Sequence, residues 1–350
     1  MSPSAIQSAL PTVMSCPDLY PFQVDWASRR ILLAKVNSAF YRDAPFLDQR
    51  AFKQQPVAEW VGLDDIARHS TGSGKKPLRL MFHMGHCGST LISRLLGDLH
   101  GVVSLREPLP LRDLATEWAE HTSPWAVRSA SAQLKDWSLL RNLWCRTWTD
   151  DGTAIVKATS FCDLLAAEWL TQFSADTALL IHVSPETYLR SMFVHDGYLN
   201  DIYGSSRARI LPHQEALDGA FAPLGELALG ERVALAFICA ALNHAAALDA
   251  GAKALDFDRF LERPEDGLSS AAAALALSPS TAEIKRVLGG QIALSYSKAT
   301  EYPFSAADRE TRMKEADSRR GADIRHGLEK INAVRANNPA IDRAIARLGY

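Results

Sequence analysis

The stretch that most constrains the fold is LRLMFHMGHCGSTLISRLLGDL, residues 78–99. Its first part, LRLMFH, is an apolar run typical of a buried strand, and LISRLLGDL has the apolar spacing of a helix with one buried side. Gly85 and Gly88 lie between them. Glycines let backbone N–H groups approach a ligand closely, and the helix N-terminus favours negative charge. A strand, a glycine turn and a helix in this order therefore predict an anion cradle at a strand end.

Further strand–helix units follow the first one. Apolar runs are GVVSL (101–105), GTAIVKATS (152–160), DTALLIHVS (176–184) and AKALDF (252–257), and helical patterns separate them. Strands that alternate with helices predict an α/β fold, a parallel sheet with helices on both faces. In such a sheet, ligands bind beyond the carboxyl ends of the strands.

The rest of the chain has weaker patterns. We expect residues 1–20 to be irregular, because they contain Pro, Ser and small residues. The apolar spacing of WASRRILLAKV favours helices over residues 21–68. The polar stretch 197–215 suggests a loop or lid, and the last part of the chain is mostly helical apart from YSKATEYPFS at 296–305.

The domain organisation expected from these patterns has two parts. Residues 1–77 would form a flexible segment and helical extension packed on the core, and residues 78–350 would form one α/β domain with a helical tail.

Composition excludes several classes of protein. The 350 residues carry a formal net charge of −2, which disfavours nucleic acid as a partner. The five cysteines are scattered without a CxxC pair, and the ten histidines form no HExxH motif, so we expect no disulfide framework and no metal site. No basic leader and no run of about 18 apolar residues is visible, so we expect a cytoplasmic protein without a membrane span.

The turn differs from an ATP-binding loop. The pattern GxxxxGK[ST] needs a lysine after its second glycine, but Ser89 follows Gly88, and His83 stands where the first glycine would be. A magnesium–ATP site is therefore disfavoured. A glycine turn that binds no ligand is the alternative.

The stretch FHMGHCGSTLISRLL resembles the 5′-phosphosulfate loop of the bacterial, P-loop-type sulfotransferases. Gly88, Ser89 and Thr90 fall on the Gly-Thr-Thr of that loop, Cys87 on its serine, and His86 on its basic residue. The resemblance implies a sulfotransferase-like three-layer α/β/α fold related to the P-loop NTPases. It also implies that the turn from Gly85 binds 3′-phosphoadenosine 5′-phosphosulfate as co-substrate.

A second stretch, LLIHVSPETYLRSMF, resembles the 3′-phosphate motif of the same family. Pro185 matches its proline and Ser191 its serine, whose hydroxyl would meet the nucleotide 3′-phosphate. Val183 and Glu186 stand in the places of two arginines. We expect another cation to replace them, and the candidates are Arg190, Arg207, Arg209 and Lys298. LDFDRFLERPEDGL and YSKATEYPFS resemble later family segments, so the resemblance spans residues 78–305.

Sulfuryl transfer is an in-line displacement that needs an anion cradle, a donor at the leaving oxygen and a base for the acceptor. Glu107, which resembles the Glu-Pro base of some family members, is the predicted base, and His86 and Lys157 are the predicted donors. Another branch of the family uses a histidine as the base, and the weaker options for it are His100, His182 and His195. The predicted nucleotide-binding residues are Gly85, His86, Cys87, Gly88, Ser89, Thr90, Ser191, Arg190 and Lys298.

Each of these residues also has a structural interpretation. Glu107 can form an ion pair with a neighbouring cation, and Lys157 can be a surface or capping residue. The Ser191 hydroxyl can bond a carbonyl one turn back.

The predicted reaction moves a sulfuryl group to a hydroxyl or amine of a small-molecule or carbohydrate acceptor. It releases 3′-phosphoadenosine 5′-phosphate and uses no metal. Two alternatives stay open: a non-catalytic or assembly protein with this fold, and a divergent kinase with Asp256 or Asp258 on Mg²⁺. A homodimer stays open, because the sequence does not reveal the oligomeric state.

Overall fold

A five-stranded parallel sheet forms the centre of the computed structural model, which describes residues 5–52, 56–70, 76–293 and 306–350. The strand order is β5-β6-β4-β7-β8, and each neighbouring pair is parallel. The strands are β4 (Arg79–His83), β5 (Val102–Arg106), β6 (Thr153–Lys157), β7 (Thr177–His182) and β8 (Lys253–Asp256). All five lie where the apolar runs predicted them, so the α/β fold class is confirmed.

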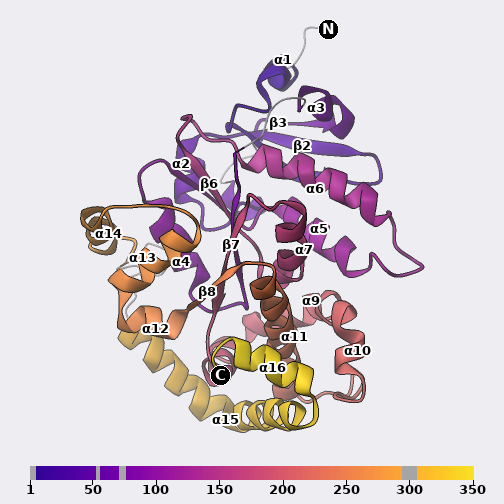
Figure 1. Ribbon diagram of the computed structural model, residues 1–350, viewed down its shortest axis with the longest axis vertical. Helices are drawn as coiled ribbons and strands as arrows, with labels where there is room; N and C mark the ends of the chain where they lie inside the picture. Colours follow the sequence, from indigo (N-terminus) through magenta and orange to yellow (C-terminus); the bar gives the residue numbers. More distant parts are fainter. Residues whose placement is uncertain (1–4, 53–55, 71–75, 294–305) are drawn as a thin grey trace.

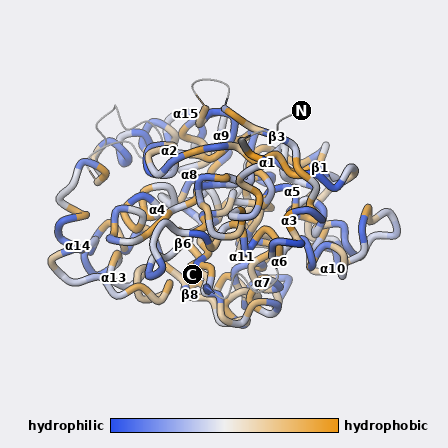
Figure 2. Tube along the Cα trace, turned by 90° about the horizontal axis from the view of Figure 1, so that it is seen from above, coloured by the Kyte–Doolittle hydropathy of each residue, from blue (hydrophilic) through white to orange (hydrophobic). Residues whose placement is uncertain are grey.

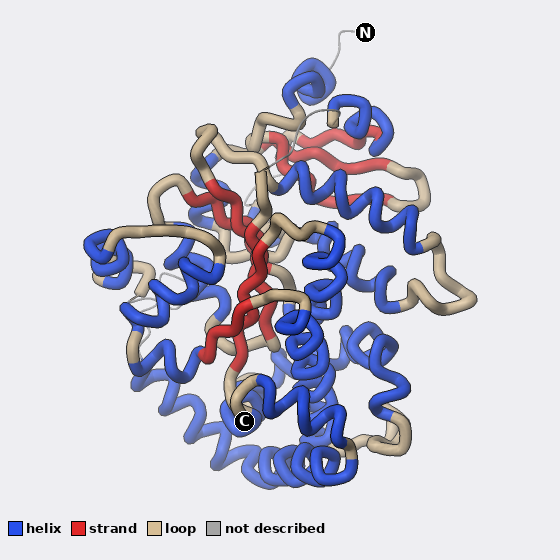
Figure 3. The backbone as a smooth tube through the Cα atoms, viewed as in Figure 1, coloured by secondary structure: helices blue, strands red, loops and turns tan. Residues whose placement is uncertain are grey.

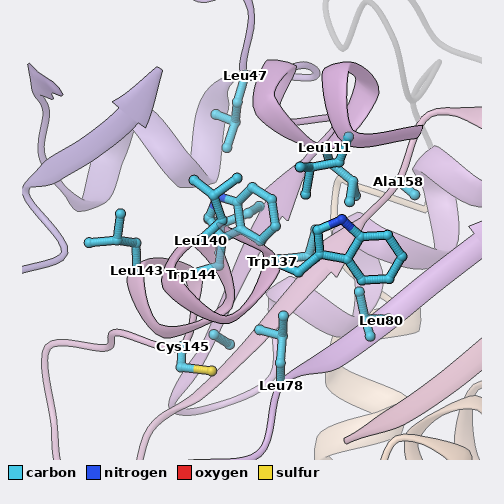
Figure 4. Close-up of a cluster of buried hydrophobic side chains, with 14 of the residues drawn as sticks. Leu47, Leu78, Leu80, Leu111, Trp137, Leu140, Leu143, Trp144, Cys145 and Ala158 are labelled. Carbon is cyan, nitrogen blue, oxygen red and sulfur yellow. The ribbon is translucent and has the colours of Figure 1, made fainter. Parts of the chain in front are cut away.

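Helices cover both faces of this sheet, as Figure 3 shows. Leu80 and Phe82 enter one buried cluster while Met81 between them enters a second, so the strand alternates between two cores. Figure 4 shows part of the first core, where Trp137 and Trp144 pack beside Leu78 and Leu80. The helices are α4 (Ser89–Gly97), α5 (Leu109–Ala119), α6 (Ala130–Trp144), α7 (Ala166–Gln172), α8 (Pro185–Met192), α11 (Leu229–Asp249), α12 (Phe257–Glu262), α13 (Pro264–Ala274), α14 (Thr281–Leu288), α15 (Ala306–Asn337) and α16 (Pro339–Arg347), with a 3-10 turn η3 (Ser160–Leu165).

The helical prediction for residues 21–68 is wrong. This region forms an antiparallel sheet of β1 (Leu19–Asp25), β2 (Arg30–Lys35) and β3 (Ala58–Gly62), at the end of the molecule that carries the N-terminus (Figure 1). The N–H groups of Ala27 and Ser28 donate hydrogen bonds to the Asp25 carboxylate, and these bonds close the turn between β1 and β2. The helices in this range are short: α2 (Ser38–Asp43), α3 (Leu63–His69) and the 3-10 turn η2 (Gln49–Ala51).

Residues 5–20 are more ordered than predicted. They contain α1 (Ala5–Ala9) and the 3-10 turn η1 (Leu10–Thr12), and they bury Ile6, Leu10 and Val13. The buried guanidinium of Arg146 donates to the carbonyl oxygens of Val13, Cys16 and Leu19 at 2.7–2.8 Å. These hydrogen bonds attach the N-terminal segment to the end of α6. The predicted domain boundary near residue 77 stays a prediction.

The stretch 197–215 is also helical rather than a loop. Its elements are α9 (Asp196–Ile210), the 3-10 turn η4 (Leu211–His213) and α10 (Gln214–Leu217). The His195 side chain caps α9 by accepting from the N–H of Gly197 at 2.9 Å. Leu199 and Ile202 are buried. The polar composition therefore reflects the exposed side of a helix that packs on the domain.

One helix, α11, is long and apolar enough to span a membrane by length and composition, but most of it is buried in the protein. It contacts α7, α8, α9, α15 and α16, which identifies it as a core helix. Figure 2 shows hydrophilic and hydrophobic stretches alternating along the helices, as expected for amphipathic segments. The segment 296–305 lies outside the described residues.

Candidate functional site

The turn after β4 has an unusual backbone. Gly85, His86 and Gly88 have φ values of 100°, 49° and 76°, in the left-handed region that favours glycine. His83, at the end of β4, supports this shape: its Nδ1 accepts from the N–H of Gly85 at 3.0 Å, and its Nε2 lies 3.0 Å from the carbonyl oxygen of Ala158. Because Nδ1 is the acceptor, Nε2 carries the proton and donates to Ala158. Both ring nitrogens of His83 therefore hold the turn in place.

Gly88 is required by its surroundings as well as by its φ. A Cβ atom at this position would overlap the ring of Phe257, the first residue of α12. The turn therefore packs directly against the ring of Phe257, which is distant from Gly88 along the chain. Cys87 points the other way: its sulfur donates to the carbonyl oxygen of Ile181 at 3.4 Å, and burial raises the pKa of the thiol to about 11. The Cys87 side chain is therefore a core contact.

A cavity of about 500 Å³ opens at the carboxyl ends of the strands and includes the turn. The turn supplies Gly85, His86, Gly88, Ser89 and Thr90 to its wall at the centre. On the β5–β6 side the wall is formed by Phe46, Arg50, Glu107, Arg112, Lys157, Thr159 and Ser160. On the β7–β8 side it is formed by Ser191, Val194, Phe257, Leu261, Arg309, Arg312 and Met313. The predicted cradle, base and 3′-phosphate serine therefore share one cavity.

Glu107 and Lys157 meet at the ends of two neighbouring strands. The Glu107 carboxylate accepts from the Lys157 ammonium, and its second oxygen lies 3.4 Å from the Thr159 hydroxyl. Lys157 is fully buried, at 1 % exposure. The neighbouring-cation alternative for Glu107 is thus present, with Lys157 as the partner. Arg106 points away, donating to the carbonyl oxygens of Ala44 and Tyr41.

The backbone of Glu107 adopts a conformation that is uncommon for a residue with a side chain. Its φ is 57°, although it is not a glycine, and its N–H donates to the carbonyl oxygen of Lys157 at 2.7 Å. Non-glycine residues in this region cost free energy and gather at functional sites. The strained backbone turns the carboxylate towards the cavity and the Lys157 ammonium.

His86 is held between the turn and α9. Its ring stacks on Tyr198 with centroids 3.7 Å apart, and its Nε2 lies 3.1 Å from a carboxylate oxygen of Asp201. Both partners line the cavity with His86. The Asp201 carboxylate and the Tyr198 ring thus fix the position of the imidazole at the turn. Tyr198 and Asp201 were not found from the sequence, because they lie in the stretch predicted as a loop.

Ser191 lines the cavity and is 5 % exposed, but the expected cations are elsewhere. Arg190, the other predicted nucleotide-binding residue of α8, forks onto Asp317 of α15 at 2.8–3.1 Å. Arg207 pairs with Glu120 on the surface. Val183 is fully buried. Lys298 lies outside the described residues.

Two arginines that the sequence analysis missed lie on the Ser191 side. Arg309 and Arg312 come from the first turns of α15, which begins beside α12 (Figure 1). Arg309 lies 3.0 Å from a carboxylate oxygen of Asp258. Their spacing of three residues, directly after YSKATEYPFS, places both on one helical face and is the signal that could have found them.

Arg209 holds part of the cavity wall in place. Its guanidinium donates to the Ser160 hydroxyl at 2.8 Å, and a Cβ on Gly85 would lie 3.3 Å from the Cβ of Ser160. Arg209 is 3 % exposed and belongs to a buried polar group with Asp163 and His244. Its role in the structure is therefore to hold η3 against the turn.

Comparisons with known proteins come from structure rather than from sequence. No protein-family profile and no curated protein matches the chain. Three similar solved structures are sulfotransferases or sulfotransferase domains.

The first is the sulfotransferase domain from the curacin biosynthetic pathway, with 12% identity and a TM-score of 0.39, covering 71% of this chain and 98% of that chain. The second is a sulfotransferase from Alicyclobacillus acidocaldarius, with 14% identity and a TM-score of 0.37, covering 73% and 96%. The third is the sulfotransferase domain from the Synechococcus PCC 7002 olefin synthase, with 12% identity and a TM-score of 0.36, covering 70% and 95%. These values are too low to carry a functional argument, so the activity must be inferred from the site's own residues.

Proposed function

We propose that the protein is a sulfotransferase. It would transfer a sulfuryl group from 3′-phosphoadenosine 5′-phosphosulfate to a hydroxyl or amine of a small-molecule or carbohydrate acceptor. The observation that carries the proposal is the shared cavity: the Gly85–Thr90 turn, Ser191 and the Glu107–Lys157 pair come from distant parts of the chain and line one cavity. Together they would supply the anion cradle, the contact for the 3′-phosphate, and the base with its neighbouring donor, which sulfuryl transfer needs in one place.

The donor would lie across β4 towards β7 and β8. Backbone N–H groups of the turn, with the Ser89 and Thr90 hydroxyls and the N-terminus of α4, suit the 5′-phosphosulfate. Ser191, Arg309 and Arg312 suit the 3′-phosphate, because arginine forks bind phosphate in two places. Arg309 and Arg312 would thus replace the arginine that is absent at position 183. The volume of about 500 Å³ is within the range of ligand pockets.

The chemical step would take place at the Glu107 end. The Glu107 carboxylate removes the proton of the acceptor hydroxyl or amine while its oxygen or nitrogen bonds to sulfur. The bond between sulfur and the bridging oxygen breaks, and the electron pair leaves with 3′-phosphoadenosine 5′-phosphate. His86, in the turn, and Lys157, at the end of β6, would donate hydrogen bonds to the leaving oxygen, and Lys157 would also orient the base.

The kinase alternative has weaker support. Asp256 caps α12 by accepting from the N–H groups of Asp258 and Arg259, and it also accepts from the Tyr350 hydroxyl at 3.2 Å. Asp258 pairs with Arg309. Both candidate magnesium ligands are therefore engaged within the protein. A non-catalytic or assembly protein stays the second alternative, because His86 and Val183 depart from the family motifs.

Calorimetry on one preparation separates these functions. We expect 3′-phosphoadenosine 5′-phosphate to bind, and Ser191→Ala to weaken its binding about tenfold through one lost charge-assisted hydrogen bond. Ser270→Ala, at an exposed serine of α13, is the matched control and should change nothing. Binding of ATP only in the presence of Mg²⁺ would support the kinase, and no binding of either nucleotide would support the assembly protein.

A further inference from the structure

One side of the cavity contains an arginine that forms no ion pair with the described residues. Among the five lysines and arginines in the wall, Lys157 pairs with Glu107, Arg50 with Asp48 and Arg309 with Asp258, and Arg312 also has a partner. The Arg112 side chain, in the first turn of α5, makes no hydrogen bond or ion pair with any residue the structure describes. A part-buried guanidinium that lines a cavity and forms no ion pair with a carboxylate is suited to bind an anion.

The position of Arg112 indicates which substrate it faces. The strand order places β5 and β6 on one side of the turn and β7 and β8 on the other. Arg112 follows β5, and it lines the cavity on the same side as Glu107. The proposed donor site uses Ser191 and the two arginines of α15 on the opposite side. Arg112 therefore lies with the base, where the acceptor must enter.

The neighbours of Arg112 complete an acceptor pocket. Arg50 forks onto Asp48, and its guanidinium stacks on the Phe46 ring, 4.1 Å from the centroid. Burial raises the pKa of Asp48, but the hydrogen bonds of Arg50 and the charge of Arg112 more than offset this and hold that pKa below its ordinary value. Arg112 is thus close to this pair without bonding to it. Phe46 adds an apolar ring to the same part of the cavity wall.

We infer that the acceptor is itself an anion: a hydroxyl or amino compound that carries a carboxylate, phosphate or sulfate bound by Arg112, with Arg50 beside it. This inference rests on the proposed function. A fixed positive site next to the base would orient the acceptor, so that its hydroxyl rather than its anionic group faces Glu107. It would also discriminate strongly against neutral analogues, because they leave the guanidinium unpaired in the cavity.

Matched pairs of acceptors test the inference. Hydroxycarboxylates would be compared with their primary amides, and hydroxyalkyl phosphates with the parent diols, in a sulfuryl-transfer assay. We expect the charged member of a pair to have at least a tenfold higher kcat/KM, and the preferred pair type identifies the anion. Arg112→Gln should abolish this preference mainly through KM and leave the affinity for 3′-phosphoadenosine 5′-phosphate unchanged. Arg343→Gln, the same change at an exposed residue of α16, is the control and should keep the preference.

Two results would overturn the inference while the proposed function stands. One is a wild-type enzyme that turns over neutral and charged acceptors equally; the other is an Arg112→Gln variant that keeps the preference or loses nucleotide binding. If the wild-type protein binds no nucleotide, the proposed function itself fails. Calorimetry with para-hydroxybenzoate and para-hydroxybenzamide then tests the anion site directly: Arg112-dependent binding of the acid alone supports it, and any other result overturns it.

Discussion

The packing of Gly88 against Phe257 gives the sharpest prediction from this structure. Gly88→Ala adds one methyl group at a φ of 76°, where it would overlap the Phe257 ring. The left-handed backbone costs about 1–2 kcal/mol for a residue with a Cβ. The overlap with a buried ring adds about 1–3 kcal/mol, the usual range for overpacking. We therefore expect the free energy of unfolding to fall by about 2–5 kcal/mol.

Two other glycines separate these contributions. Gly219 has a φ of 67° with nothing within 4 Å of an added Cβ, so Gly219→Ala measures the backbone cost alone. Gly204 lies inside α9 with nothing within 4 Å of an added Cβ and no positive φ. Gly204→Ala should therefore stabilise the protein by about 1 kcal/mol, the difference in helix propensity.

Urea unfolding with unchanged m-values measures all three variants. The double variant Gly88→Ala/Phe257→Ala removes the overlap, so its loss of stability should be smaller than the sum of the two single losses by about 1–3 kcal/mol. Equal destabilisation by Gly88→Ala and Gly219→Ala, or strict additivity in the double variant, would refute the argument that Phe257 closes the cradle. The same packing predicts that Gly88→Ala weakens binding of 3′-phosphoadenosine 5′-phosphate in calorimetry.

Three further predictions concern charged side chains. Glu107→Gln should lower kcat by about 10²–10⁴-fold in the transfer assay while nucleotide affinity is kept, and full retained activity would remove Glu107 as the base. Burial raises the pKa of Asp163 to about 7. Between about pH 4 and pH 7 the folded protein therefore keeps a proton on Asp163 that the unfolded chain has released. The free energy of unfolding should fall as the pH rises through this window. Asp163→Asn should remove this fall; urea titrations of both proteins across the window measure it, and parallel pH profiles would contradict it. Asp176 is buried and accepts from Arg141, Leu78 and Trp169 at 2.8–3.0 Å, so Asp176→Asn should cost about 3–5 kcal/mol in urea unfolding, and a loss below 1 kcal/mol would show that the network relaxes.

Mistaken local predictions show where the sequence pattern is ambiguous. In WASRRILLAKV the apolar residues fit helical spacing, yet they form the second half of a hairpin, because Arg30–Lys35 pairs with strands on both sides. A short apolar run fits both periods, and only pairing with distant residues decides between them. In 197–215 the polar residues are the exposed side of α9, whose buried side is held by other helices.

The sequence by itself determined the five strand–helix units and the place of the Gly85–Thr90 turn. These depend on local properties: apolar period, glycines at positive φ, and a helix start directly after a strand. The sequence could also propose Glu107, Lys157 and Ser191, because the ends of parallel strands lie at one edge of a sheet.

Only the tertiary structure decided which charged side chains lie around that turn. Lys157 pairs with Glu107, Arg190 turns to α15, and Arg309 and Arg312 reach the cavity from a helix near the end of the chain. Within the described residues, the Arg112 guanidinium lines the cavity without an ion pair. Ion pairs form between side chains that the fold brings within a few ångströms, so separation along the chain does not reveal them.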